Sequence, residues 1–236
     1  MNLILLFKDD FIPGTDRVRL DGRRLKHIQD VHRAAIGDTL NIGIENGSTG
    51  IGIITRLDSE ILEMEITAET PPAAPCPVNL ILALPRPKVI SRVILSASTL
   101  GIKNIWLINA KRVEKSYWQS PRLSEENLRK QLILGLEQAK DTLMPGIIKK
   151  PLFKPFVEDE LPEIIKDTIP IVAHPVTSDT CPTPAGKQIT LAIGPEGGFI
   201  PYEIEKLIEC GFLPFTIGDR ILRVETVIPF ILGKLS

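Results

Sequence analysis

Apolar residues follow two different spacings along the chain, and the spacing changes at a proline-rich segment. Before this segment, short apolar runs alternate with glycine turns, and Asn46-Gly47 between two runs is a hairpin signal. Residues 23–35 instead repeat at helical spacing, with Leu25, Ile28 and Val31 on the inner face. We therefore expect a small β-barrel that carries a single helix. Its strands are predicted over residues 1–7, 39–44, 50–55 and 61–66.

After the proline-rich segment, strand and helix patterns alternate. Continuous apolar runs predict buried parallel strands over residues 78–84, 105–108, 169–173, 189–193 and 215–217. Helices are predicted over 88–100, 124–140 and 201–210, and from 225 onward. This alternation is typical of an α/β fold, with helices on both faces of a parallel sheet.

Local signals set the bounds of these helices. In the first helix, the inner face is predicted to hold Val89, Val93, Ala97 and Leu100, with Gly101 as the stop. Ser124 is expected to cap the second helix. Pro201 begins the third helix and Gly211 ends it.

The proline-rich segment is predicted to be a stiff linker. Residues 71–77 hold four prolines, and proline is excluded from helix interiors and central strands. We therefore expect an N-terminal domain over 1–70 and a second domain over 78–236.

Composition narrows the class of protein. A hydrophobic content of 43% with 24% charged residues suits a globular chain with a buried core. Three well-separated cysteines fit neither a disulfide framework nor zinc spacing, so we expect no metal and a reducing cytoplasm. The apolar start lacks the basic region of a signal peptide, and no apolar run reaches the length of a membrane span. We expect a cytoplasmic protein with no membrane partner.

The net charge is −1, but positive charge gathers near the N-terminus. This cluster is either a binding surface for a phosphate backbone or a solvated face. The candidate residues for binding such a backbone are Arg17, Arg19, Arg23, Arg24, Lys26 and Arg33.

Two glycine-rich turns follow predicted strands close to the C-terminus. The first is Gly194-Pro195-Glu196-Gly197-Gly198, and the second runs from Gly218 to Thr226. Such turns at the carboxyl ends of neighbouring strands form a floor where a flat ligand approaches bare backbone. Together they predict a ligand site at this edge of the sheet.

The pair of turns resembles the C-terminal signature of the 16S ribosomal RNA uridine-N3 methyltransferase family, in the SPOUT class. Glu137-Gln138 is similar to a family element on the helix facing the methyl donor, and the N-terminal part looks like the family's RNA-binding barrel. The resemblance implies a trefoil-knotted α/β domain preceded by a PUA-like β-barrel. It also implies S-adenosylmethionine as cofactor, 16S ribosomal RNA or the small ribosomal subunit as partner, and a homodimer.

The resemblance assigns the methyl donor to the two turns. Glycines admit the adenosine, apolar side chains form its walls, and Glu196 faces either the sulfonium or a helix N-terminus. The expected cofactor-binding residues are His174, Leu191, Ile193, Gly194, Pro195, Glu196, Gly197, Gly198, Ile217, Gly218, Ile221, Leu222 and Thr226.

Methylation at uracil N3 requires loss of an imide proton or stabilisation of the developing anion. We expect Arg223 to stabilise the charge and Glu225 to accept the proton, with Arg112 as a further catalytic candidate; surface ion pairing is the alternative for each arginine. Tyr117 and Trp118 either stack a base or pack in the core or against a second copy in a dimer. An alternative function is a non-catalytic RNA-binding or ribosome-assembly protein, because Asp141 stands where the family usually has an arginine.

Overall fold

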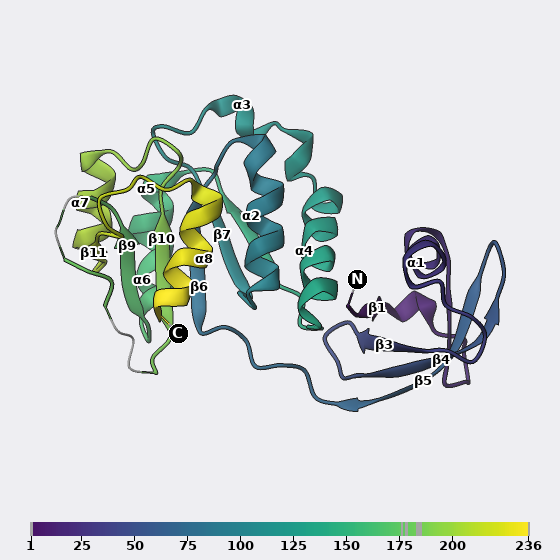
Figure 1. The fold of residues 1–236 in the computed structure, drawn as a ribbon. Helices are drawn as coiled ribbons and strands as arrows, with labels where there is room; N and C mark the ends of the chain where they lie inside the picture. Colours follow the sequence, from purple (N-terminus) through teal and green to yellow (C-terminus); the bar gives the residue numbers. More distant parts are fainter. Residues whose placement is uncertain (1, 176, 178, 183–185, 236) are drawn as a thin grey trace. The chain divides into compact units, whose positions relative to one another are not determined.

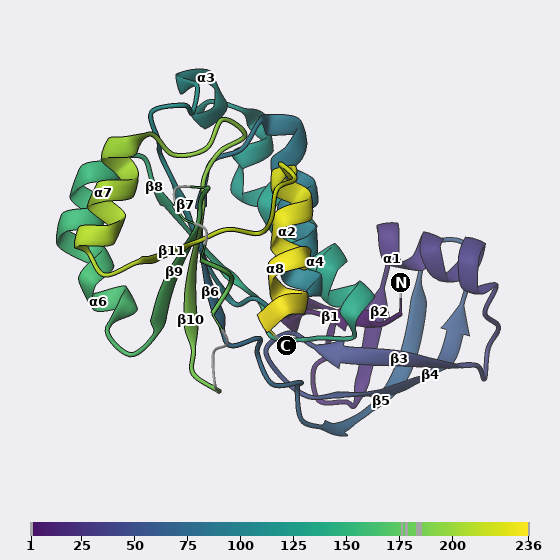
Figure 2. The ribbon, with the colours of Figure 1, turned by 60° about the vertical axis from the view of Figure 1, so that its left-hand side comes forward.

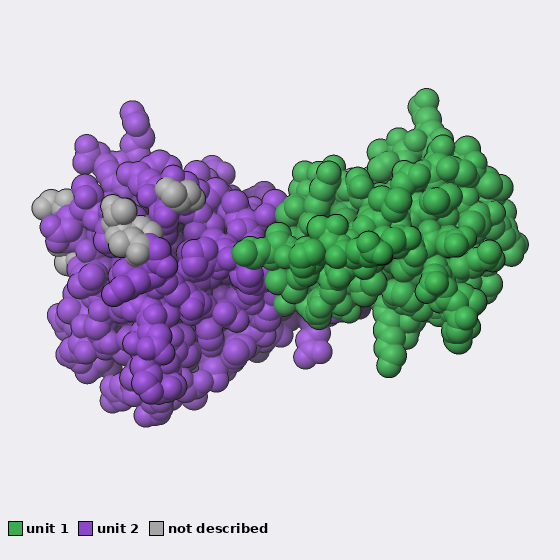
Figure 3. All heavy atoms as spheres, turned by 90° about the horizontal axis from the view of Figure 1, so that it is seen from below, with its two compact units in different colours: residues 1–74, 133–144 green, residues 75–132, 145–236 purple. Residues whose placement is uncertain are grey.

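The computed structural model describes residues 2–175, 177, 179–182 and 186–235, and the chain divides into two compact units (Figures 1 and 3). Unit 1 comprises Met1–Ala74 and Ile133–Met144, and unit 2 comprises Pro75–Leu132 and Pro145–Ser236. Helix α4 (Glu125–Ala139) contributes residues to both units. Within the described ranges, no helix is both long and apolar enough to cross a membrane.

Unit 1 is built on a five-stranded sheet in the order β1-β3-β4-β5-β2. β1 pairs with β3 in parallel, and the other neighbours are antiparallel. Asn46 lies in the turn between β3 and β4 with a φ of 56°, which confirms the predicted hairpin. The strands are β1 (Ile4–Leu6), β2 (Arg17–Leu20), β3 (Thr39–Ile44), β4 (Thr49–Leu57) and β5 (Leu62–Thr70).

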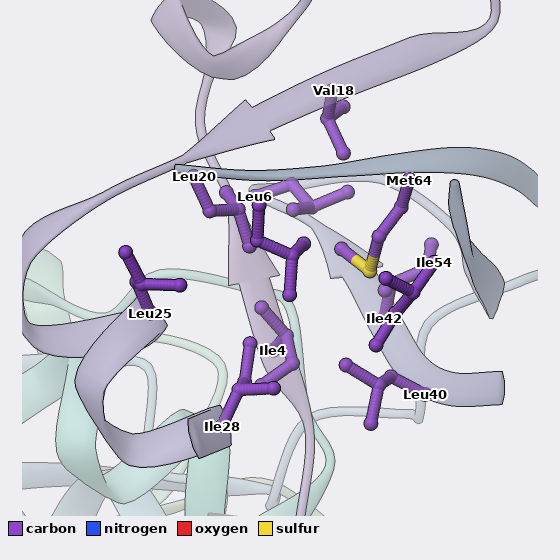
Figure 4. Packing of buried hydrophobic residues seen from close by; sticks show 11 residues of the cluster. Ile4, Leu6, Val18, Leu20, Leu25, Ile28, Leu40, Ile42, Ile54 and Met64 are labelled. Atoms are coloured by element: carbon purple, nitrogen blue, oxygen red, sulfur yellow. The ribbon is translucent and has the colours of Figure 1, made fainter. Parts of the chain in front are cut away.

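The helix of unit 1 is shorter than the sequence pattern predicts. α1 (Gly22–His27) continues into a π-helical turn over Ile28–His32. Leu25 and Ile28 pack into the core of the sheet as expected (Figure 4). Val31 is 63% exposed, so its predicted place on the inner face is wrong. A π-turn advances each residue through a smaller angle than an α-turn, which rotates Val31 away from that face.

The segment 133–144 packs into unit 1 although it lies more than sixty residues beyond β5. Leu136 is buried against Leu3 and Leu5, and the backbone N–H of Leu3 donates to the Glu137 carbonyl over 3.1 Å. The Thr142 hydroxyl donates to the Gly47 carbonyl over 2.6 Å. These bonds anchor the end of α4 to β1 and to the β3–β4 turn.

Unit 2 is a six-stranded parallel sheet in the order β11-β9-β10-β6-β7-β8. Helices α6 (Leu161–Ile165) and α7 (Pro201–Glu209) cover one face, and α2 (Pro87–Thr99) and α8 (Val224–Leu235) cover the other (Figure 2). This confirms the predicted α/β class. The strands are β6 (Val78–Ala83), β7 (Asn104–Ile108), β8 (Gly146–Lys150), β9 (Ile169–Ala173), β10 (Ile189–Ile193) and β11 (Leu213–Phe215).

Further short elements complete the two units. β8 and the helical segment 153–165 were not predicted, because β8 is a half-exposed edge strand without a continuous apolar run. β11 begins two residues before the predicted strand. The short elements are η1 (Lys8–Asp10), α3 (Lys115–Trp118), η3 (Pro121–Leu123), α5 (Phe153–Pro155) and η4 (Phe156–Glu160).

The predicted ends of the helices are confirmed. Gly101 has a φ of 80° directly after α2, Gly211 has a φ of 111° after α7, and the Ser124 hydroxyl accepts the Asn127 N–H at the start of α4. The predicted inner face of α2 is partly wrong, because Leu100 is 37% exposed. The buried face consists of Ile90, Val93, Ile94, Ala97 and Ser98.

Three arginines of the N-terminal cluster are ion-paired within unit 1. Arg19 pairs with Glu63 over 2.8 Å, and Arg23 pairs in bidentate geometry with Glu137. Arg24 pairs with Asp10 through two bonds of 2.6 Å and also donates to the Leu5 carbonyl. The Arg24 and Asp10 side chains are only 14% and 9% exposed, so this pair belongs to the framework of unit 1.

We expect Arg24→Ala to destabilise unit 1 by about 3 kcal/mol, because it leaves the buried Asp10 carboxylate without its cation. The exposed Arg17→Ala should change the free energy of unfolding by less than about 0.5 kcal/mol. Urea denaturation of both variants measures the difference. Equal losses in the two variants would contradict a framework role for the Arg24–Asp10 pair.

Candidate functional site

Loops that follow β6, β7, β9, β10 and β11 meet at the carboxyl edge of the unit 2 sheet (Figure 1). In open parallel sheets, this is the edge at which ligands bind. Both glycine-rich turns lie here, since the first follows β10 and the second follows β11.

The first turn is folded tightly on itself. The Gly198 N–H donates to the Pro195 carbonyl over 2.8 Å, and Gly198 has a φ of 74°. A Cβ on Gly194 would lie 2.9 Å from the Phe199 nitrogen and 3.2 Å from Gly198 backbone atoms. Gly194 is therefore required by the turn itself, whose own backbone fills the space that a side chain would take.

Arg112, in the loop after β7, lies across this turn. Its guanidinium donates to the Gly197 carbonyl, and a Cβ on Gly197 would lie 2.9 Å from the Arg112 Cδ. The structure thus brings Arg112, a predicted catalytic residue, to the first glycine turn. The space beside Gly197 is occupied by this side chain.

Two carboxylates tie the first turn to neighbouring loops. Glu196 accepts the Arg86 N–H over 2.9 Å, at the N-terminus of α2. Of the two predicted orientations of Glu196, the structure shows the one toward a helix N-terminus. Glu203 accepts the Ile200 N–H over 2.9 Å and the Lys111 N–H over 2.6 Å.

Glu203 is a site residue that the sequence interpretation missed. It is 3% exposed and links the loop after β7 to the start of α7. The sequence did contain a signal for the contact with the start of α7. Pro201 at the first helical position followed by Glu203 at the third is a helix-start signature. The bond to Lys111 joins residues 92 positions apart, which no local pattern encodes.

His174 follows β9 and reaches the first turn. Its backbone N–H donates to the Phe215 carbonyl, and its Nε2 lies 3.4 Å from the Phe199 carbonyl oxygen. Its Nδ1 is buried with no hydrogen-bond partner among the described residues. Burial lowers the pKa of His174 and the charge of Arg112 lowers it further, against the opposing effect of the Phe199 carbonyl. The ring is therefore neutral at pH 7, with one nitrogen left for a ligand.

The apolar residues predicted for the donor site are divided between the core and the surface. Leu191 and Ile193 are buried within β10, whereas Ile217 and Leu222 are half-buried. Ile221 is 99% exposed, so it does not pack against the first turn. Pro195 is buried in the first turn, while Gly218, with a φ of 112°, is exposed in the second.

The second turn ends at the N-terminus of α8. The exposed Arg223 caps this helix through its carbonyl, which accepts the N–H groups of Thr226 and Val227. Glu225 pairs with Arg92 of α2 over 3.1 Å. Glu225, the predicted proton acceptor, is therefore held in an ion pair.

The Glu137 element lies in unit 1. Glu137 is buried there, and its carboxylate binds Arg23 in bidentate geometry. Asp141 also lies in unit 1 and accepts the Leu143 N–H over 3.0 Å. No cluster of potential metal ligands is found among the described residues.

The predicted RNA-binding residues differ in availability. Arg24 is part of a nearly buried pair, and Arg19 and Arg23 are bound to carboxylates. Arg17, Lys26 and Arg33 have exposed side chains.

Residues 72–236 match the RNA methyltransferase domain family. Ribosomal RNA small subunit methyltransferase E of Treponema pallidum is 28% identical over 235 residues, which cover 96% of this chain and 87% of the relative. The protein of that name from Mesomycoplasma hyopneumoniae is 30% identical over 161 residues, 66% of this chain and 68% of the relative.

Solved structures share the fold. The crystal structure of ribosomal RNA small subunit methyltransferase E from Neisseria gonorrhoeae, bound to S-adenosyl methionine, has a TM-score of 0.76 and 20% identity. The match covers 100% of this chain and 95% of that chain. The family model matches residues 72–236, and the Treponema pallidum relative aligns with nearly the whole sequence. This chain therefore belongs to the RNA methyltransferase family.

Proposed function

We propose that this protein is an S-adenosylmethionine-dependent methyltransferase that modifies N3 of a uridine in 16S ribosomal RNA of the small subunit. The observation that supports it most is the pair of glycine turns at one edge of a parallel sheet, in a chain of the RNA methyltransferase family. The names of the relatives favour ribosomal RNA of the small subunit as substrate.

The residues at this edge fit the methyl donor. The buried Nδ1 of His174 lacks a partner among the described residues, and an adenosine offers both donors and acceptors. The tight first turn contains three glycines, so apart from the Arg112 side chain that lies across it, its backbone groups have little side-chain cover, which suits the edge of a flat base. When bound, S-adenosylmethionine supplies a methyl group on a cationic sulfur.

The arginines around the turns are the candidates for charge stabilisation. Arg223 is exposed at the start of α8, where it can contact the oxygens of a uracil ring. Arg112 already donates to the Gly197 carbonyl, so we assign it first to holding the turn. Glu225 acts as proton acceptor only when its ion pair with Arg92 opens.

We propose that the domain over 78–236 is trefoil-knotted, that the domain over 1–70 is a PUA-like RNA-binding barrel, and that 71–77 is the linker. The working unit would be a homodimer in the cytoplasm. The exposed Ile221 is consistent with an apolar surface that a second copy or the substrate covers.

The direct test is methylation of a 16S ribosomal RNA transcript, and of isolated small subunits, with labelled S-adenosylmethionine. Mass spectrometry of the nucleosides should detect 3-methyluridine. Donor binding without any methylated nucleoside on either substrate would instead favour a non-catalytic RNA-binding or assembly protein.

We expect Gly194→Ala to weaken donor binding about tenfold or more, because the added methyl group displaces the turn backbone that the donor contacts; tenfold in Kd corresponds to about 1.4 kcal/mol. The added methyl group would meet backbone atoms of Gly198 and Phe199. Titration calorimetry measures the change. Gly233→Ala in α8 is the matched control, because nothing lies within 4 Å of its added Cβ. Parent-like binding by Gly194→Ala would mean that this turn does not form the donor site.

Arg223→Ala should leave donor binding within a few fold and lower the methylation rate roughly a hundredfold, as expected for loss of one donor to a developing anion. Single-turnover kinetics at saturating donor separate the two effects. If the variant instead loses the donor while its single-turnover rate stays normal, Arg223 is a binding residue. Arg112 would then be the next catalytic candidate.

In the barrel, we expect Arg17→Glu with Lys26→Glu to weaken binding of a 16S ribosomal RNA transcript. The slope of log affinity against log salt should become shallower by about 1 for each lost phosphate contact. These positions are exposed, whereas changes at Arg23 or Arg24 would disturb ion pairs within unit 1. An unchanged affinity and slope would identify the cluster as a solvated face.

A further inference from the structure

Unit 2 carries its own concentration of exposed cations beside the glycine turns. We propose that this surface, which we call the α2–α3 basic surface, holds the phosphate backbone of the RNA while its base is methylated. The proposal rests on the function proposed above. The surface consists of Arg86, Lys88, Lys111, Arg112 and Lys115.

Contacts of Arg86 and Arg112 place two of these residues at the carboxyl edge of the sheet, and the other three lie in the same segments of the chain. Burial raises the pKa of the Tyr117 hydroxyl and its hydrogen bond to Glu114 adds to the rise, while the neighbouring Arg86 guanidinium opposes it. Arg86 at the start of α2 therefore lies beside α3. Arg112, in the loop between β7 and α3, donates to the Gly197 carbonyl. This bond connects the surface to the donor turns. Figure 1 shows α3 at the edge of the sheet where α2 begins.

Lys88 stands where its charge does not favour folding. Lys88 is the second residue of α2, and the first turn of this helix contains no acidic residue. Positive charge at a helix N-terminus opposes the helix dipole, and an acidic residue there would be stabilising. A lysine that destabilises its own helix and lies beside the candidate site is expected where its charge is used for binding, because binding residues are commonly kept at a cost in stability.

The local charge balance also favours a polyanion. Segments 85–89 and 109–118 contain five lysines and arginines and one acidic residue, Glu114. Glu196, which comes from the glycine turn, is engaged with the Arg86 N–H. In unit 1, by contrast, Arg19, Arg23 and Arg24 are each paired with a carboxylate.

An aromatic residue in the same loop suggests RNA as the polyanion. The Trp118 indole N–H donates to the Asn109 side chain over 3.1 Å, so the half-buried ring is held in a fixed orientation. Exposed cations beside an oriented aromatic ring are the combination that binds single-stranded nucleic acid, through its phosphates and an unstacked base. The surface lies in the same compact unit as the donor turns. An RNA bound to it can therefore present a base to the methyl donor.

The test is the double variant Lys88→Glu/Lys115→Glu, which leaves the arginines of the donor site in place. Its affinity for a 16S ribosomal RNA transcript should fall about tenfold or more, and the salt slope should become shallower by about 1 for each lost contact. An RNA of equal length and scrambled sequence should show the same loss, because phosphate contacts carry no sequence information. Donor binding should be unchanged, and the Lys88→Glu change should not lower thermal stability, because a glutamate in the first turn of α2 is favourable to the helix dipole.

Lys166→Glu/Lys187→Glu is the matched control. It makes the same charge change at exposed positions near the opposite, amino-terminal edge of the sheet. Parent-like RNA affinity and salt slope in Lys88→Glu/Lys115→Glu, or an equal loss in the control, would overturn the proposal. A protein that binds RNA through this surface but never methylates it would contradict the proposed function while leaving the surface supported. Absence of RNA binding by the parent would overturn both.

Discussion

The candidate site depends on two carboxylates of the segment that follows β10. Glu203 is buried and accepts backbone N–H groups from Ile200 and Lys111, while Glu196 accepts the Arg86 N–H. In the sheet, β10 and β7 lie on either side of β6, so these bonds connect the loops of three adjacent strands. A buried carboxylate requires hydrogen-bond donors, and backbone N–H groups supply them without a cation. The first glycine turn is thereby fixed before any ligand binds.

Fixing these loops determines the environment of the nearby side chains. Because Lys111 is held by Glu203, the adjacent Arg112 extends over Gly197 and donates to its carbonyl. The charge of Arg112 then adds to burial in lowering the pKa of His174, which keeps that ring neutral. A neutral ring with an unpaired nitrogen suits a hydrogen bond to a nucleoside better than contact with a phosphate.

Positive charge is used differently in the two units. In unit 1, Arg24 and Asp10 form a nearly buried pair, and Arg23 satisfies the buried carboxylate of Glu137. Their guanidinium groups stabilise the unit because removing either would leave a carboxylate without its partner. In unit 2, Lys88 and Lys115 are exposed at helix N-termini, where their charge has no such structural task. Local charge density alone therefore does not identify a binding surface.

The sequence by itself determined the parts of this protein that depend on neighbouring residues. Continuous apolar runs predicted β9 and β10 at their observed bounds, and Gly101 and Ser124 marked helix ends, because these signals act within a few residues. The two glycine turns also located the candidate site. Tertiary structure decided that segment 133–144 packs into unit 1 and that Val31 faces solvent after a π-turn. It also decided that Glu196 binds the Arg86 N–H and Glu203 the Lys111 N–H, because those hydrogen bonds join residues about a hundred positions apart and no spacing rule reaches that far.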